Sequence, residues 1–265
     1  ELGALLTELR KPTHTVREMF AGIPLVLPRI APCISVTPAA LAQYLDPSLT
    51  FDVVVFEQAS QLPTAATIGA LSRAGSAVIV GDSQLLPPFA MVRGDRSVET
   101  DGLLADALAA RLPELRLGWH YRARHEDVVA YANERFYGDR LQLFPAMQAS
   151  SELGLVARPI GRAPELVAEL LARLRDPANP GRSLGLVTFS RALRDQVLDL
   201  IDDVRRDEPL LDALTEPLAI EHVIDAQQLS RDVVLVALED GPVIDPRRLC
   251  VALTRAREQL VLCTG

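Results

Sequence analysis

Apolar residues along the chain gather in two kinds of segment. Longer segments with an apolar residue at every third or fourth position predict amphipathic helices. Shorter runs rich in β-branched residues are typical of strands buried on both faces. The expected helices are 64–73, 102–111, 126–136, 164–175 and 191–205, and the expected strands are 51–56, 77–80, 184–188, 233–237 and 260–263. This alternation predicts an α/β fold with parallel sheets covered by helices on both faces.

A change of domain is expected near residue 95. Pro87-Pro88 ends the segment after the second strand, and a loop with Gly94 and Asp95 follows. Residues 1–95 would then hold two of the predicted strands and residues 96–265 the other three. The sequence predicts two α/β domains with a cleft between them, and ligands in such folds bind at the carboxyl ends of the strands.

The basic residues limit the possible chemistry. The chain has 27 lysines and arginines, of which Lys11 is the only lysine, and its net charge is −8. No Gly-Lys-Ser or Gly-Lys-Thr is present, which excludes a phosphate-binding P-loop within these residues. Schiff-base chemistry is excluded unless Lys11 performs it. The negative charge argues against a strongly basic nucleic-acid coat, but it permits a local groove lined by arginines.

Cysteines, histidines and apolar runs point to a reducing, cytoplasmic setting. The three cysteines are widely spaced, the four histidines lack zinc-ligand spacing, and no apolar run approaches 18 residues. We therefore expect no disulfide framework, no zinc site and no membrane partner. The start at Glu1 lacks the basic region of a signal peptide, and we interpret it as an internal start or a trimmed chain.

Acidic residues follow two of the expected strands. Glu57-Gln58 comes directly after the first strand, and Gly81-Asp82 comes after the second. A Mg²⁺ ion bound to nucleotide phosphates is a common use for such carboxylates. Capping of the next helix is an equally good interpretation of either acid by itself.

Six stretches in a fixed order carry a family resemblance. They are 32–38 (PCISVTP), 51–61 (FDVVVFEQASQ), 81–88 (GDSQLLPP), 119–126 (WHYRARHE), 186–190 (LVTFS) and 248–257 (RLCVALTRAR). In this order they resemble the motor core of superfamily 1 DNA/RNA helicases, in the branch of the nonsense-decay and Okazaki-flap helicases. The resemblance covers nearly the whole chain. It implies tandem RecA-like domains of the P-loop NTPase type, with a partial first domain at 1–95 and a second at 96–265.

The resemblance also implies roles for particular residues. ATP and Mg²⁺ would lie between the two domains, next to a path for single-stranded DNA or RNA. The catalytic positions match Glu57 (also a weak Mg²⁺ ligand), Gln58, Arg122 and Arg255; nucleotide contacts match Asp82, Gln84, Gln227 and Arg257; nucleic-acid contacts match Ser35, Thr37, Pro38, Thr188 and Ser190.

Simpler interpretations stand beside these roles. Arg255 would otherwise be a surface ion pair, and the hydroxyl residues would be helix caps. We expect Arg124 and Arg191 to be solvated charges. Trp119 fits a place in the core better than base stacking.

The departures from the family pattern occur at the positions expected to take part in ATP hydrolysis. Glu57 replaces the Asp that holds magnesium, and Gln58 replaces the Glu that activates water. An amide cannot accept that proton. Leu85 replaces a Gln that senses the γ-phosphate, and residues 227–230 (QQLS) lack the Gly and Glu of motif V.

Three functions follow as hypotheses. The first is a helicase-like module that binds nucleic acid or a partner protein and does not hydrolyse ATP alone. The second is the C-terminal part of an active ATP-dependent helicase whose Walker A segment lies upstream or on another subunit. The third is a protein-interaction domain without a nucleic-acid role.

Overall fold

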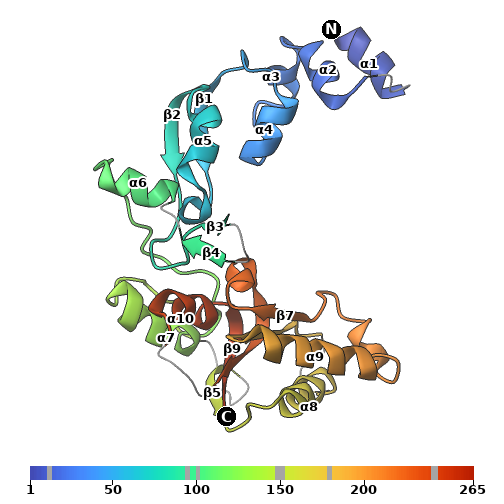
Figure 1. The fold of residues 1–265 in the computed structure, drawn as a ribbon, viewed down its shortest axis with the longest axis vertical. Coiled ribbons are helices and arrows are strands. Elements are labelled where there is room, and N and C mark those ends of the chain that lie inside the picture. Colours follow the sequence, from blue (N-terminus) through green and yellow to red (C-terminus); the bar gives the residue numbers. More distant parts are fainter. Residues whose placement is uncertain (11–13, 93–95, 100–101, 147–152, 178–180, 240–243) are drawn as a thin grey trace. The chain divides into compact units, whose positions relative to one another are not determined.

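The computed structural model describes residues 1–10, 14–92, 96–99, 102–146, 153–177, 181–239 and 244–265 (Figure 1). Lys11, Gly94 and Asp95 lie outside these ranges. The chain forms two compact units. Unit 1 comprises residues 1–83 and 87–114, and unit 2 comprises residues 84–86 and 115–265.

The boundary between the two compact units differs from the domain boundary that we expect near residue 95. It lies after Glu114, because helix α6 (Leu103–Ala109) packs against α5 and β2 and so belongs to unit 1. A boundary near residue 95 would have separated α6 from the elements that it contacts.

Unit 1 consists of short helices around two pairs of strands. Strands β1 and β2 are parallel, with Phe51 opposite Ala74 and Phe56 opposite Ile79, while β3 and β4 are antiparallel. The elements are α1 (Leu2–Arg10), α2 (Val16–Ala21), α3 (Leu27–Ile30), α4 (Pro38–Tyr44), β1 (Phe51–Phe56), η1 (Ala59–Gln61), α5 (Thr64–Leu71), β2 (Ala74–Ile79), β3 (Phe89–Val92), β4 (Arg96–Glu99) and α6.

The first two predicted strands exist, but the prediction that both faces are buried was wrong. Phe56 and Ile79 pack with the helices in the core of unit 1, whereas Val53, Val55 and Val78 are exposed. The reason is that β1 and β2 pair only with each other among the described residues, and the helices cover one face.

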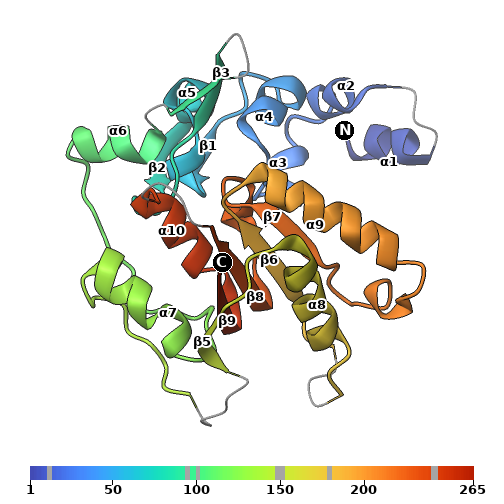
Figure 2. The same cartoon turned by 60° about the horizontal axis from the view of Figure 1, so that its bottom comes forward.

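Unit 2 contains a five-stranded parallel sheet in the order β5-β9-β8-β6-β7. Helices α8 and α9 lie on one face and α7 and α10 on the other (Figure 2). The elements are α7 (Asp127–Ala132), the π-helix η2 (Asn133–Tyr137), β5 (Gly154–Arg158), α8 (Ala163–Leu174), β6 (Leu184–Thr188), α9 (Arg191–Val204), η3 (Pro209–Leu211), β7 (Ala219–His222), η4 (Asp225–Gln228), β8 (Arg231–Leu238), α10 (Pro246–Leu253) and β9 (Ala256–Thr264).

The predicted α/β class with parallel sheets is confirmed. The expected strands at 184–188, 233–237 and 260–263 lie within β6, β8 and β9. The central strands are buried because the apolar residues of α8 and α9 pack directly on them. Among the residues described, no helix is both long enough and apolar enough to cross a lipid bilayer.

Candidate functional site

Two arginines of unit 2 converge on Thr254, the residue that directly follows α10. The Arg255 side chain donates hydrogen bonds from Nη2 to Thr254 Oγ1 (2.6 Å) and from Nη1 to the Gln227 carbonyl oxygen. Arg122 Nη1 donates to the Thr254 carbonyl oxygen at 3.2 Å. Thr254 is itself fixed, because its hydroxyl donates to the Cys250 carbonyl oxygen at 2.8 Å. The structure thus brings together three of the predicted site residues, Arg122, Arg255 and Gln227.

The surroundings of these arginines concentrate positive charge. Arg255 is only 3% exposed, so it is not the ordinary surface charge of the alternative interpretation. Burial lowers the pKa of the Arg122 guanidinium. Burial also lowers the pKa of His120, and the nearby charges of Arg122 and Arg255 lower it further. Both guanidinium groups are held on Thr254, and guanidinium groups are hydrogen-bond donors suited to an anion such as a phosphate group.

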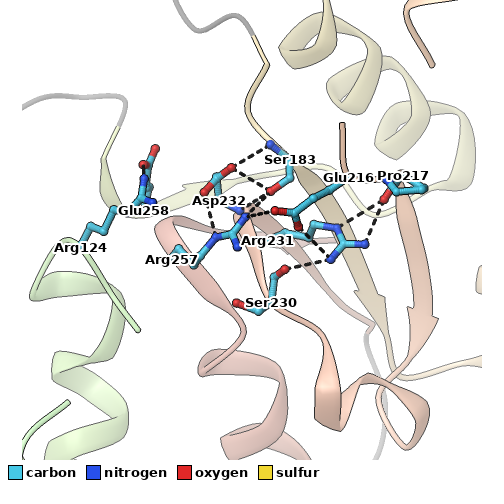
Figure 3. Close-up of polar contacts among 9 residues, drawn as sticks. All are labelled: Arg124, Ser183, Glu216, Pro217, Ser230, Arg231, Asp232, Arg257 and Glu258. Atoms are coloured by element: carbon cyan, nitrogen blue, oxygen red, sulfur yellow. Dashed lines mark hydrogen bonds and ion pairs between the residues drawn. The ribbon is translucent and has the colours of Figure 1, made fainter. Parts of the chain in front are cut away.

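Arg257 belongs to a different cluster, which Figure 3 shows in close-up. Its Nε lies 2.9 Å from Asp232 Oδ1, and its Nη2 lies 2.8 Å from both Ser183 Oγ and Glu216 Oε1. Arg231 also pairs with Glu216, at 3.3 Å. The hydrogen bond to Glu216 and the pairing with Asp232 raise the pKa of Arg257. Two carboxylates therefore neutralise Arg257, and its contacts are those of a structural clamp at the amino ends of the strands.

Asp232 is the acid at the centre of this clamp. Burial alone would raise the pKa of Asp232, but hydrogen bonds from the Ser183 N–H, the Ser183 hydroxyl and Arg257 hold it below its usual value. Ser183 and Asp232 lie at the starts of β6 and β8, so the clamp ties neighbouring strands together.

The hydroxyl residues at the carboxyl end of β6 form hydrogen bonds with neighbouring residues of the chain. Thr188 is fully buried, and its hydroxyl donates to the Ser190 carbonyl oxygen at 3.0 Å. Ser190 Oγ accepts from the Leu193 N–H at 3.2 Å and caps α9. The helix-cap interpretation is thus confirmed for Ser190, which also lines an adjoining cavity.

That cavity measures about 510 Å³ and includes Arg162, Ser190, Gln196 and Glu239 in its lining. Glu239 directly follows β8 and hydrogen-bonds with Ser190, while burial raises its pKa. Our sequence prediction missed Glu239. The signal was present, since this acid follows a buried strand in the same way as Glu57 follows β1.

In unit 1, the turns after β1 and β2 lie against each other. The Ala59 N–H donates to the Val80 carbonyl oxygen at 2.8 Å, and Gln58 adopts a left-handed conformation with φ 51°. A Cβ atom on Gly81 would lie 3.0 Å from the Ser60 nitrogen, so glycine permits this close approach. Both strand ends are therefore at one edge of the sheet.

This edge carries the predicted magnesium position. Glu57 and Gln58 are exposed, and Asp82 is half-buried on the neighbouring strand end. The described residues contain no group of three or more His, Cys, Asp or Glu side chains placed to hold a metal. Mg²⁺ commonly takes only one or two protein carboxylates together with phosphate oxygens, so Glu57 fits such a role.

The remaining predicted contacts of unit 1 are simpler. Thr37 Oγ1 accepts from the Ala40 N–H at 3.1 Å and caps α4, in which Pro38 is the first residue. Ser35 is exposed. Gln84 groups with unit 2. The capping interpretation is therefore confirmed for Thr37.

Of the remaining expectations, those for the two surface arginines agree with the structure and the one for Trp119 does not. Arg124 and Arg191 are mostly exposed, as expected, and they pair with Glu258 and Asp225. Trp119 was expected in the core but is 51% exposed, and its ring stacks on Phe144 with 5.2 Å between centroids. The reason is that the segment holding Trp119 makes only an isolated bridge to Gln142 and lies outside the sheet.

Comparison with known proteins points to helicases. No protein-family model matches the chain. An uncharacterized ATP-dependent helicase of Mycoplasma genitalium (MG140) is 26% identical over 257 residues, and its Mycoplasma pneumoniae homologue is 24% identical; each match covers 80% of this chain. The chain spans 23% of the length of these relatives. Among solved structures, the match to the PRRSV helicase (TM-score 0.45, 15% identity) covers 79% of this chain and 34% of the viral chain. The match to arterivirus nonstructural protein 10, a helicase (TM-score 0.45, 12% identity), covers 83% of this chain and 41% of the viral chain.

Proposed function

We propose that this chain is a helicase-like module that binds nucleotide phosphate and single-stranded DNA or RNA but does not hydrolyse ATP on its own. The observation that carries the proposal is the pair of arginines held on Thr254. Arg255 is buried, Arg122 is exposed, and both donate hydrogen bonds to neutral oxygens, an arrangement suited to the charge of a phosphoryl group. The sequence similarity to ATP-dependent helicases supports ATP as the nucleotide.

The lack of hydrolysis follows from the edge of β1. Gln58 stands where the helicase pattern has the carboxylate that activates water, and an amide cannot take up the proton. Loss of a general base costs roughly 10²- to 10⁴-fold in rate. Glu57 would hold Mg²⁺, which supplies charge neutralisation to the phosphates when bound. No lysine other than Lys11 is present to assist.

Nucleotide binding is tested by titrating a fluorescent ATP analogue into the chain. We expect Arg255→Gln to weaken binding about tenfold or more, because a charge-assisted contact to phosphate is lost. Arg124→Gln is the matched control, since Arg124 is mostly exposed and paired with Glu258. Equal binding by the wild type and Arg255→Gln would contradict the assigned role.

Nucleic-acid binding is tested with a labelled single-stranded oligonucleotide at two salt concentrations. Phosphate contacts give a steep fall of affinity with salt. Ser35, Thr37, Pro38, Thr188 and Ser190 remain the predicted contacts. Absence of binding at low salt would favour the alternative of a protein-interaction domain.

A second candidate function is the C-terminal part of an active helicase. It is favoured by the length of the curated relatives, of which this chain spans 23%. The first of the two predicted RecA-like domains, which is partial, would then be completed by a Walker A segment on further polypeptide. Recovery of ATP turnover on adding a polypeptide with Gly-Lys-Thr would support this candidate, and Gln58 argues against it.

A further inference from the structure

The cavity of about 510 Å³ in unit 2 lies at the carboxyl edge of the five-stranded sheet. Three of its lining residues come from strand ends: Gly161 shortly after β5, Ser190 shortly after β6 and Glu239 directly after β8. The volume is in the range of pockets that bind small ligands, roughly 300–1,000 Å³. Ligands of parallel α/β sheets bind at this edge. The chemistry of the lining therefore indicates which ligand the cavity would take.

Glu239 supplies the strongest hydrogen-bond acceptor of the cavity. The Ser190 N–H and the Ser190 hydroxyl both donate to its carboxylate. Ser190 is itself held in place, because its Oγ accepts from the Leu193 N–H at 3.2 Å. A carboxylate has about four acceptor positions on its two oxygens, so two donors from Ser190 leave room for more. A ligand that pairs with Glu239 has to present N–H or O–H groups.

The charges around the cavity favour a neutral ligand. Among the described lining residues, Arg162 and Glu239 are the only charged ones, and Arg162 pairs with Glu165. The Glu239 carboxylate repels a phosphate group placed next to it. Helices α8 and α9 both begin at the cavity, and the partial positive charge of a helix N-terminus disfavours a cation. The ligand is therefore expected to donate hydrogen bonds without carrying a full charge.

The rest of the lining suits a flat ligand with apolar faces. Pro164 at the start of α8 and Ala192 and Leu193 at the start of α9 give the cavity apolar walls, and Gln196, one turn after Ala192, adds an amide. A nucleobase combines apolar faces with a polar edge. Proteins that recognise single strands hold unstacked bases against flat or apolar side chains and form hydrogen bonds with the base edges.

Among the nucleobases, guanine matches an ionised carboxylate best. Its N1–H and its amino group lie side by side and can donate together to the two carboxylate oxygens, as a guanidinium group does. Cytosine and adenine carry a ring acceptor nitrogen beside the amino group, and thymine carries a carbonyl on each side of its N–H. Each of these three bases would place an acceptor against the carboxylate. The O6 carbonyl of guanine would accept from the Gln196 amide.

We propose that this cavity binds the base of a guanine nucleotide in the single strand, with Glu239 as the residue that determines the preference. Glu239 accepts from N1–H and from the amino group, and Gln196 donates to O6. The preference rests on the proposed binding of a single strand, because Ser190, a predicted contact of that strand, also lines the cavity. It adds a sequence preference, which contacts to phosphates do not supply.

The first test uses labelled oligothymidines that differ at one central base, which is thymine, guanine or hypoxanthine. Hypoxanthine is guanine without the amino group. We expect the wild type to bind the guanine strand about fivefold or more tightly than the other two, because a bidentate contact to a base edge discriminates to this extent. Glu239→Gln should bind all three strands within about twofold of one another. Glu134→Gln is the matched control, since Glu134 is an exposed glutamate of η2 in the same unit, and it should keep the preference.

The strands separate this inference from the proposed function. Equal affinity of the wild type for the guanine and hypoxanthine strands would overturn the inference, and so would a guanine preference that persists in Glu239→Gln. Binding of the strand that contains only thymine tests the proposed function instead, because thymine offers no pair of neighbouring donors. Loss of the preference in Glu239→Gln with unchanged binding of that strand is the result that we expect.

The second test removes the strand. Guanosine or inosine is added to the isolated chain, and amide exchange is followed by mass spectrometry. Guanosine should slow exchange at the start of α9 more than inosine does, and Glu239→Gln should abolish the difference. Displacement of guanosine by N-acetylarginine amide at a lower concentration than by guanosine itself would overturn the inference, because the cavity would then fit an arginine of a partner protein. If no strand binds, the proposed function fails and this test alone decides: absence of protection by guanosine would overturn the inference.

Discussion

Replacement of Arg257 separates a structural role from a nucleotide-binding role. Arg257→Met keeps most of the aliphatic stem but removes the charge and the bonds to Asp232, Ser183 and Glu216. The Asp232 side chain is only 16% exposed, so its charge is left poorly compensated. Breaking a buried pair costs about 3–5 kcal/mol, and we expect about 2–3 kcal/mol here because Ser183 still donates two hydrogen bonds to Asp232.

The assay is urea unfolding followed by tryptophan fluorescence. Trp119 is the single tryptophan and lies in unit 2, so it reports on the unit that contains the clamp. With a slope of about 2 kcal/mol per molar urea, the midpoint should fall by about 1 M or more. Arg124→Met should change stability by less than about 1 kcal/mol, because the Arg124 side chain is mostly exposed and Glu258 keeps its ion pair with Arg182. An unchanged midpoint for Arg257→Met, or a loss of nucleotide affinity without a loss of stability, would refute the reasoning.

Three further predictions concern unit 2 and the cysteines. Ser190→Ala removes the cap of α9 and should lower the free energy of unfolding by about 1 kcal/mol in the same urea assay. Burial raises the pKa of Glu239 above 4.5 in the folded state, so the wild type loses stability as pH rises through that folded pKa. In urea unfolding, the free energy of unfolding of Glu239→Gln relative to the wild type should therefore be higher at about pH 7 than at about pH 4. An equal difference between the two proteins at both pH values would contradict this. N-ethylmaleimide should modify Cys33 alone in the folded chain, because Cys250 and Cys263 are buried and burial raises the pKa of Cys263 to about 12; mass spectrometry of the intact chain counts the adducts.

The sequence predicts unit 2 well because its strands are covered on both faces. Apolar runs such as 184–188 and 233–237 are unbroken, and these are the central strands of the sheet. The edge strands β5 and β7 were missed, since their sequences, GLVAR and AIEH, mix polar and apolar residues. The same rule misled us in unit 1, where an apolar run predicts a covered strand and one face of β1 is exposed.

The candidate site could be predicted only as a set of residue types. The motif order singled out Arg122, Arg255 and Arg257 alike, because all three are arginines at matching positions. The structure adds that Arg257 pairs with Asp232 and Glu216, which come from distant parts of the chain. No spacing in the sequence indicates those pairings, which depend on how the strand ends meet in the folded sheet.

The measurement that tests the central claim most directly is ATP turnover by the purified chain with saturating single-stranded DNA or RNA. The account predicts phosphate release no faster than the buffer background, together with saturable binding of the ATP analogue that Arg255→Gln weakens. Gln58 is the physical reason for this prediction, because an amide cannot act as the general base. Nucleic-acid-stimulated turnover at the rate of active helicases, abolished by Arg255→Gln, would contradict the account.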